Sequence, residues 1–210
     1  MAKNNLKYTA YEEIKKRIIV GDVKGGEPLN EQLFIEELGI SRTPIREALS
    51  MLQHEQLVEI YPKQGVFFTR VSYKDVVDIY SIRIVLESHA VKLATDKIDQ
   101  RKLEKQYELW NEVDTSENQI EHVAKDRSLH AMIVESTDNK YLIKYLEQLY
   151  DQANRIRHIS LKSSSGRIGQ THTEHLKIIA GMLERDPQKA GKAMEEHLTN
   201  ARDTALRFFS

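Results

Sequence analysis

Apolar residues recur every three to four positions in the first part of the chain, which is the spacing of an amphipathic helix. A first helix is predicted for residues 8–20, where Gly21 ends the pattern. Its apolar face is expected to consist of Tyr8, Tyr11, Ile14 and Ile18. After a turn, Asn30 is expected to cap a short second helix that Gly39 closes. The inward residues predicted for this second helix are Leu33, Phe34 and Leu38.

A third helix is predicted directly after Gly39. Thr43 is expected to be its N-cap, with Pro44 at the first helical position. Its buried stripe is expected to contain Ile45, Leu49 and Leu52. Two short apolar segments then flank residues 62–65, which is typical of a β-hairpin. Two helices joined by a short glycine-bearing turn and followed by a hairpin predict a winged helix-turn-helix.

The remainder of the chain predicts only helices, because glycine is missing from residues 66–165 and proline from residues 63–186. Helix starts are expected at Ser72, Asp99, near Ser116 to Asn118, at Asn139, near Gly166 and at Asp186. The fold class is therefore mainly α. We expect a winged helix-turn-helix of three helices and a β-hairpin in residues 1–72, followed by an all-α bundle of about six helices in residues 73–210.

Composition excludes several classes of protein. The 210 residues contain no cysteine, so a disulfide scaffold, cysteine-ligated zinc and thiol catalysis are excluded. No segment approaches the roughly 18 apolar residues of a membrane span, and the first residues do not resemble a secretory signal. We therefore expect a cytoplasmic protein without a membrane partner. The formal net charge is −1, so any nucleic acid must be met by locally placed basic groups.

The predicted third helix begins with side chains that suit DNA, and a recognition helix contacts DNA with its N-terminal residues. The candidates are Ser41, Arg42, Thr43 and Arg46 in the helix and Lys63 and Gly65 at the hairpin tip. Arginine can pair with guanine through two hydrogen bonds, and hydroxyls suit phosphates. An isolated pair of arginines at this spacing is usually a solvated helix face. The surrounding turn and hairpin favour the DNA-binding interpretation.

Histidines and one aspartate fall on inward faces of the predicted bundle. Asp126 and His130 lie four residues apart and share one helix face that is otherwise apolar. His197 lies on the apolar stripe of the last helix, while His172 and His175 share a face of the helix before it and the spacing does not separate them. A single core histidine is usually just hydrogen-bonded to a neighbour. One carboxylate with three imidazoles suits a divalent transition ion such as zinc, nickel or manganese.

Residues 30–67, NEQLFIEELGISRTPIREALSMLQHEQLVEIYPKQGVF, closely resemble the winged-helix domain of the GntR family of bacterial transcription regulators. YSIRIVLESHAVKLA, which begins at residue 80, resembles the opening of the FadR-type effector domain. The family's DNA-contacting positions fall on Arg42, Thr43, Arg46 and Gly65. Many members have an arginine where this chain has Gln32, so the resemblance implies an altered DNA contact there.

The metal-binding branch of the FadR-type domain has an Asp-x-x-x-His motif and two later histidines. The resemblance therefore implies Asp126, His130, His175 and His197 as ligands, with His172 as the rival of His175. Arg83 lies where the family has an arginine in its first effector-domain helix, and beside a metal it can clamp a carboxylate. The alternative for Arg83 is a surface ion pair with Glu87, four residues further on.

These observations favour a homodimeric transcription regulator, a repressor by resemblance, that reads double-stranded DNA with two-fold symmetry. A small carboxylate bound at the metal is expected to shift the balance between DNA-competent and DNA-incompetent dimers. A metal-dependent hydrolase is a second hypothesis, but the sequence has no H-E-x-x-H motif to supply a base, so we do not expect an enzyme. A DNA-binding protein with a purely structural metal is a third.

Overall fold

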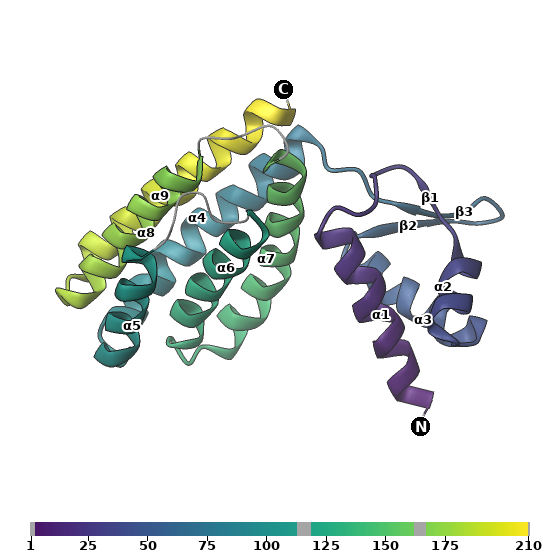
Figure 1. Cartoon of the computed structure of the whole chain (residues 1–210), viewed down its shortest axis with the longest axis horizontal. Coiled ribbons are helices and arrows are strands. Elements are labelled where there is room, and N and C mark those ends of the chain that lie inside the picture. The colour runs from purple at the N-terminus through teal and green to yellow at the C-terminus, as the bar shows by residue number, and fades with distance from the viewer. Residues whose placement is uncertain (1–2, 113–118, 162–166, 210) are drawn as a thin grey trace. The chain divides into compact units, whose positions relative to one another are not determined.

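The computed structural model describes residues 3–112, 119–161 and 167–209. The chain divides into two compact units, Met1–Val71 and Ser72–Ser210. In the described ranges these units contain nine helices and three short strands (Figure 1). No helix in these ranges is long and apolar enough to cross a membrane. The mainly helical fold class is confirmed.

The first unit is a winged helix-turn-helix. Its elements are α1 (Lys3–Ile19), β1 (Pro28–Leu29), α2 (Glu31–Leu38), α3 (Arg42–His54), β2 (Val58–Tyr61) and β3 (Gly65–Phe68). The expected hairpin is formed by β2 and β3, and β1 adds a third antiparallel strand on the other edge of β3. Sequence patterning assigned this strand to a turn because it is only two residues long. The predicted stripe of α3 is buried, with Ile45, Leu49 and Leu52 in the core.

Helix caps in the first unit follow the prediction at α2 and differ at α3. Asn30 accepts hydrogen bonds from the backbone of α2, and Gly39 ends that helix in a left-handed conformation with φ of 62°. Helix α3 starts at Arg42 with Ser41 as its N-cap, so the prediction that Thr43 caps it is wrong. Pro44 is therefore the third helical residue. It is tolerated there because the first four N–H groups of a helix have no intrahelical acceptor.

Two residues predicted to face inward in the first unit are exposed, Tyr8 and Leu33. In α1 the fully buried Ala10 lies with Ile14 and Ile18 on a face that is turned away from Tyr8. In α2 the buried side chain is Phe34, and Leu33 lies about 100° further round the helix.

The second unit contains only helices in its described part: α4 (Tyr73–Thr95), α5 (Gln100–Asn111), α6 (Gln119–Glu135), α7 (Lys140–Leu161), α8 (Arg167–Leu183) and α9 (Pro187–Phe209). The expected caps at Ser72, Asp99, Asn139 and Asp186 are all present as side-chain hydrogen bonds to the first turn of the helix that follows. The starts predicted near Ser116 to Asn118 and near Gly166 lie outside the described residues, although α6 and α8 follow them directly.

Helix α4 is the central element of the second unit. It packs against α9 on one side and against α6 and α7 on the other, and α8 lies beside α9 (Figure 1). The core between them contains Trp110, Leu129, Ile133, Ile178 and Met194. Buried polar side chains from α4, α6, α8 and α9 also lie inside this bundle.

Candidate metal centre and nucleic-acid interface

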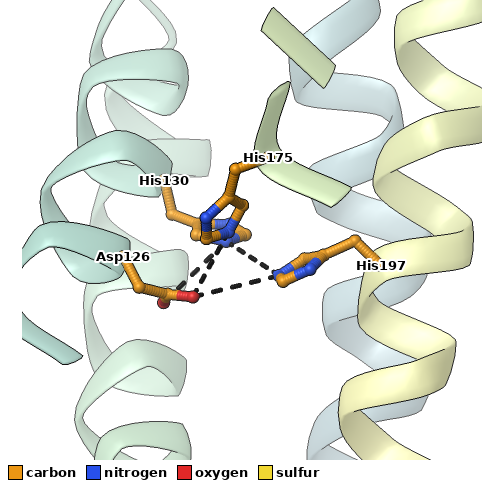
Figure 2. Close-up of side chains that lie close together, drawn as sticks. All are labelled: Asp126, His130, His175 and His197. Atoms are coloured by element: carbon orange, nitrogen blue, oxygen red, sulfur yellow. Dashed lines mark hydrogen bonds and ion pairs between the residues drawn. The ribbon is translucent and has the colours of Figure 1, made fainter. Parts of the chain in front are cut away.

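Four buried side chains from three helices converge inside the second unit (Figure 2). Helix α6 contributes Asp126 and His130, one turn apart, while His175 comes from α8 and His197 from α9. Each offers one ligand atom, and these atoms all lie within 4.8 Å of one another. The four residues are at most 3% exposed.

The three histidines present the same ring atom to the centre of this group. The Nε2 atoms of His130 and His197 are 3.3 Å apart. The Nε2 atom of His175 is 3.3 Å from Asp126 Oδ1, and that of His197 is 4.0 Å from the same oxygen. Three imidazole nitrogens and a carboxylate oxygen directed at one point form the donor set of a divalent transition ion.

His175 gives a separate test of whether these residues fit a metal. The side chain is fully buried. Among the described residues its Nδ1 atom has no hydrogen-bond partner, and its Nε2 atom has only the 3.3 Å contact with Asp126 Oδ1. Buried polar atoms are nearly always satisfied, so an imidazole whose one polar contact is another candidate ligand requires an explanation. A cation beside its Nε2 atom provides one, and the donor set therefore fits a metal ion.

The electrostatic environment keeps two of the candidate ligands, His175 and Asp126, in the protonation states that a metal requires. Burial and the neighbouring His197 lower the pKa of His175 to about 3, which leaves the ring neutral. Burial alone would raise the pKa of Asp126. The Arg157 guanidinium and the nearby His130 and His175 outweigh that effect and hold the pKa well below its usual value.

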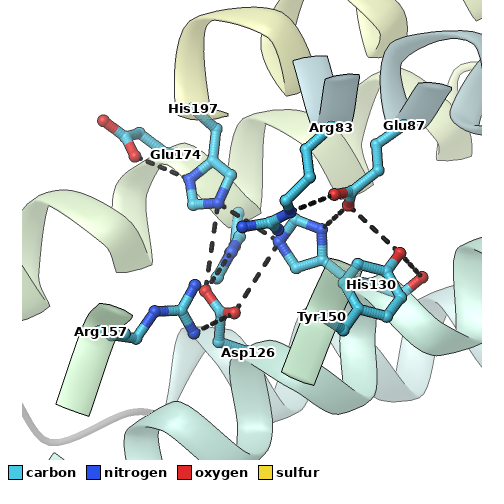
Figure 3. A network of polar contacts seen from close by, with 9 residues as sticks. Arg83, Glu87, Asp126, His130, Tyr150, Arg157, Glu174 and His197 are labelled. Carbon is cyan, nitrogen blue, oxygen red and sulfur yellow. Dashed lines mark hydrogen bonds and ion pairs between the residues drawn. The ribbon is translucent and has the colours of Figure 1, made fainter. Parts of the chain in front are cut away.

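Two carboxylates orient the histidines from behind (Figure 3). Glu87 Oε2 is in close contact with Nδ1 of His130, and Glu174 Oε2 lies 2.8 Å from Nδ1 of His197. An Nδ1–H that donates to a carboxylate leaves Nε2 unprotonated and directed at the centre. Glu174 also accepts from the Asn200 amide at 2.7 Å.

These two carboxylates were missed as part of the site. The sequence places Glu174 about 100° round its helix from His175, which is correct, but it does not reveal that α9 brings His197 to that side. Glu87 was recognised only as a partner of Arg83.

Arg83 lies in the same buried network and is 1% exposed. Its Nε atom donates to Glu87 Oε1 at 2.7 Å, so the alternative ion pair is present, but inside the bundle rather than on the surface. The guanidinium carbon lies 5.2 Å from the ring centroid of Tyr80 and 5.5 Å from that of Tyr150. Its Nη1 atom has no partner among the described residues. Arg83 and His130 together lower the pKa of Glu87 to about 2, against the opposing effect of burial.

A cavity opens beside the four candidate ligands. Asp126 and His197 form part of its wall, and so does Arg157, whose Nη1 atom donates to Asp126 Oδ2. The other lining residues are Tyr80, His122, Val123, Ser160, Ile168, Thr171, Ala201, Thr204 and Ala205. Arg157 had no distinguishing signal in the sequence. His172, the rival of His175, lies outside the group of four, and its ring is 6.3 Å from that of Trp110.

The candidate DNA-binding residues lie together on the surface of the first unit. Ser41, Arg42, Thr43, Arg46, Lys63 and Gly65 are all exposed. A groove between α3 and the wing is lined by Arg46, Lys63 and Gly65, among others. Glu31 at the start of α2 accepts from Arg46 Nε at 3.3 Å. Gln32 is also exposed, and its amide donates to Glu36.

A winged helix with exposed arginines beside its wing, followed by an all-helical unit around a buried polar group, defines a two-domain transcription regulator. Residues 6–68 match the family model described as bacterial regulatory proteins, gntR family. Residues 78–200 match the FCD domain. The chain therefore belongs to the GntR family of bacterial regulatory proteins and carries an FCD domain.

Similar proteins agree with this membership. The HTH-type transcriptional repressor GlaR of Escherichia coli strain K12 is 30% identical over 198 residues, which cover 90% of each chain. The solved structure of E. coli McbR/YncC is 20% identical and covers both chains completely, with a TM-score of 0.84. The Zn2+-bound FCD domain of TM0439 is also 20% identical, with a TM-score of 0.54 over 65% of this chain and 95% of that one. At this level of identity both structures support the fold.

Proposed function

We propose that this regulator is a repressor whose binding to its operator is controlled by a small carboxylate bound at a metal ion in the FCD domain. The observation that carries the proposal is the buried group of one aspartate and three histidines with a cavity at its side. A transcription regulator needs a site where a ligand can change the balance of its states, and this group and cavity lie inside the second unit.

Asp126, His130, His175 and His197 hold the metal in this proposal, and zinc is the preferred ion because the ligands are nitrogen and oxygen donors in a compact set. The bound ion would supply a fixed positive charge that attracts a carboxylate. The same set also suits nickel or manganese. The zinc-bound FCD domain of TM0439 supports the choice of zinc.

Arginine side chains support a carboxylate as the effector. Arg157 lines the cavity, and Arg83 carries a buried Nη1 atom with no partner in the described part of the chain. Guanidinium groups bind carboxylates through paired N–H donors. We assign Arg83 and Arg157 to effector binding.

DNA binding is assigned to Arg42, Arg46, Thr43 and Ser41 at the start of α3, with Lys63 and Gly65 in the wing and Gln32 beside them. The operator is expected to be double-stranded DNA with two-fold symmetry, because each protomer of a homodimer reads one half-site.

An exposed apolar stripe supports a homodimer. Ile82, Val85 and Leu93 lie on the outer side of α4, and Tyr141 and Tyr145 are exposed on α7, which packs against α4. Large exposed apolar patches usually mark interaction surfaces. We propose that this stripe, Ile82, Val85, Leu93, Tyr141 and Tyr145, pairs with its copy on a second chain.

A hydrolase is less well supported by the geometry. Metal-dependent hydrolysis needs a carboxylate placed to activate water. Glu87 and Glu174 are the buried glutamates beside the site in the described ranges, and each already contacts the Nδ1 atom of a histidine. We therefore propose that the protein is not an enzyme. A purely structural metal remains an outcome of the test below.

Operator binding by the zinc-loaded protein tests the proposal. DNA sequences selected from a random pool would be labelled, and binding would be followed by fluorescence anisotropy with and without a panel of small carboxylates. We expect at least one acid to weaken binding by tenfold or more in wild type and to have no effect on the His197→Ala variant. If no acid changes DNA binding although zinc is bound, the metal is structural.

A further inference from the structure

An acidic side chain lies on the proposed DNA-binding surface of the first unit. Glu31, the first residue of α2, lines the groove between α3 and the wing together with Arg46, Lys63 and Gly65. Resting on the DNA binding by Arg46 proposed above, we infer that Glu31 is a positioning residue. By holding the Arg46 guanidinium, it sets how sharply Arg46 discriminates between base pairs.

The contact between the two side chains uses one particular atom of the guanidinium. Glu31 Oε2 accepts from Arg46 Nε at 3.3 Å, between residues that are 15 apart in the sequence. A guanidinium has five N–H donors, so four remain on the two terminal nitrogens. Two of these can donate to O6 and N7 of one guanine. The carboxylate therefore holds the inner side of the guanidinium and leaves its outer end for a base edge.

Arg46 gains from such a support because it projects into solvent. Its side chain is 64% exposed, whereas that of Glu31 is 25% exposed. A long exposed side chain loses conformational freedom when it is fixed against a base. Glu31 is the more constrained partner, at the start of a helix that Asn30 caps. A contact made before DNA binds reduces the loss of freedom for the one orientation that it supports.

The charge of Glu31 acts against DNA binding in general. DNA presents negatively charged phosphates, so a carboxylate in this groove opposes every sequence alike. Residues 1–71 contain ten lysines and arginines and ten aspartates and glutamates, so the first unit has no surplus of positive charge to offset it. The ion pair also makes Arg46 a weaker partner for phosphates. Both effects lower the affinity for unrelated DNA more than the affinity for a sequence whose guanine Arg46 contacts.

A structural role for Glu31 predicts a different result. An acidic residue in the first turn of a helix stabilises that helix through its charge, and Glu31 occupies such a position in α2. If this were its whole role, loss of Glu31 would weaken binding to all DNA by one factor. If Glu31 only repelled phosphates, its loss would strengthen binding to all DNA by one factor. Positioning of Arg46 instead changes the ratio of two affinities.

This ratio is measured with the full chain and two DNA duplexes. One duplex carries the operator selected from a random pool, and the second differs from it at the G·C pair for which Arg46→Ala loses the preference. Fluorescence anisotropy gives both dissociation constants at one salt concentration, since affinity for DNA depends on salt. We expect Glu31→Ala to lower the ratio by about three- to fivefold, with equal or tighter binding of the second duplex.

Three further variants serve as controls. Glu37→Ala also removes an ion pair from α2, but its partner is Arg17 of α1, whose Nη2 atom is 2.7 Å away, so it should keep the wild-type ratio. Glu31→Asp keeps the charge at the start of α2 and shortens the side chain, so it should lower the ratio as Glu31→Ala does. In a chain that already carries Arg46→Ala, Glu31→Ala should leave the ratio unchanged.

The outcomes separate this inference from the proposed function. An unchanged ratio in Glu31→Ala or Glu31→Asp overturns the positioning role, and so does an equal fall in Glu37→Ala. A fall that persists in the chain with Arg46→Ala also overturns it, because Glu31 would then act without Arg46. In each of these cases DNA reading by Arg46 stands. If no sequence is selected, or Arg46→Ala keeps every preference of wild type, that proposed reading fails and the inference fails with it.

Discussion

Individual carboxylates behind the histidines decide how well the proposed metal is held. Glu174 reaches Nδ1 of His197 from the neighbouring helix, while Glu196, adjacent to His197 in sequence, is exposed and 4.0 Å from Lys192. The two glutamates thus have the same side chain, but only Glu174 contacts His197. This difference gives a matched pair of variants.

Glu174→Gln is expected to weaken zinc binding by about 10- to 100-fold, because a neutral amide oxygen accepts the Nδ1–H bond of His197 more weakly than the carboxylate and makes the ring a poorer ligand. Glu196→Gln should leave zinc affinity unchanged. Competition with a chromophoric chelator measures both dissociation constants. Equal affinity in the two variants would show that Glu174 does not orient a metal ligand.

Arg46 is the single side chain on which sequence-specific DNA binding is expected to depend most. Arg46→Ala should weaken binding to the selected operator by tenfold or more, since a paired contact with guanine contributes about 1–3 kcal/mol. Lys105→Ala removes an equal charge from an exposed position on α5 in the second unit, and it serves as the control. Similar losses in the two variants would contradict a base contact by Arg46.

At the scale of elements, α4 connects the proposed parts of the regulator. It begins with the capping box of Ser72 and Asp75, directly after the first unit ends at Val71. Its inner face carries Glu87, which contacts His130 of α6, and its outer face carries Ile82, Val85 and Leu93 of the exposed stripe. A shift of α4 would therefore change the candidate metal group and the proposed dimer surface together.

Val85 tests the proposed dimer surface, because it is 67% exposed and belongs to that stripe. Val85→Glu is expected to convert a dimer into a monomer at micromolar concentration, since it places a charge in an apolar interface. Tyr107→Glu makes a comparable change on partly exposed α5 and should remain dimeric. Sedimentation equilibrium distinguishes the two. A dimeric Val85→Glu would place the interface elsewhere.

Elements were easier to predict than the contacts between them. Caps such as Asn30 and Asp186 and the run of residues without glycine predicted most helix positions, because these are local signals. The start of α3 was missed, since proline also fits at the third helical position. Arg157, Glu87 and Glu174 meet the histidines through tertiary packing, which periodicity cannot specify. The metal-binding role of the four inward residues stays a prediction.

For the whole molecule, the two units have separate hydrophobic cores. A metal bound by α6, α8 and α9 would stabilise only the second unit, because an ion that binds the folded state alone shifts its unfolding equilibrium. Removal of zinc with a chelator is expected to lower the melting temperature of one calorimetric transition and leave the other unchanged. At a zinc concentration 1,000 times Kd the stabilisation is about 4 kcal/mol. A uniform shift of both transitions would contradict this assignment.

The metal content of the purified protein tests the central claim most directly. Wild type, His175→Ala and His172→Ala would be purified without added metal and analysed for metal per chain by inductively coupled plasma mass spectrometry. We predict about one zinc, nickel or manganese ion per chain in wild type and in His172→Ala, and a loss of most of it in His175→Ala. No stoichiometric metal in wild type, or equal content in all three proteins, would contradict the account and leave these histidines as core residues.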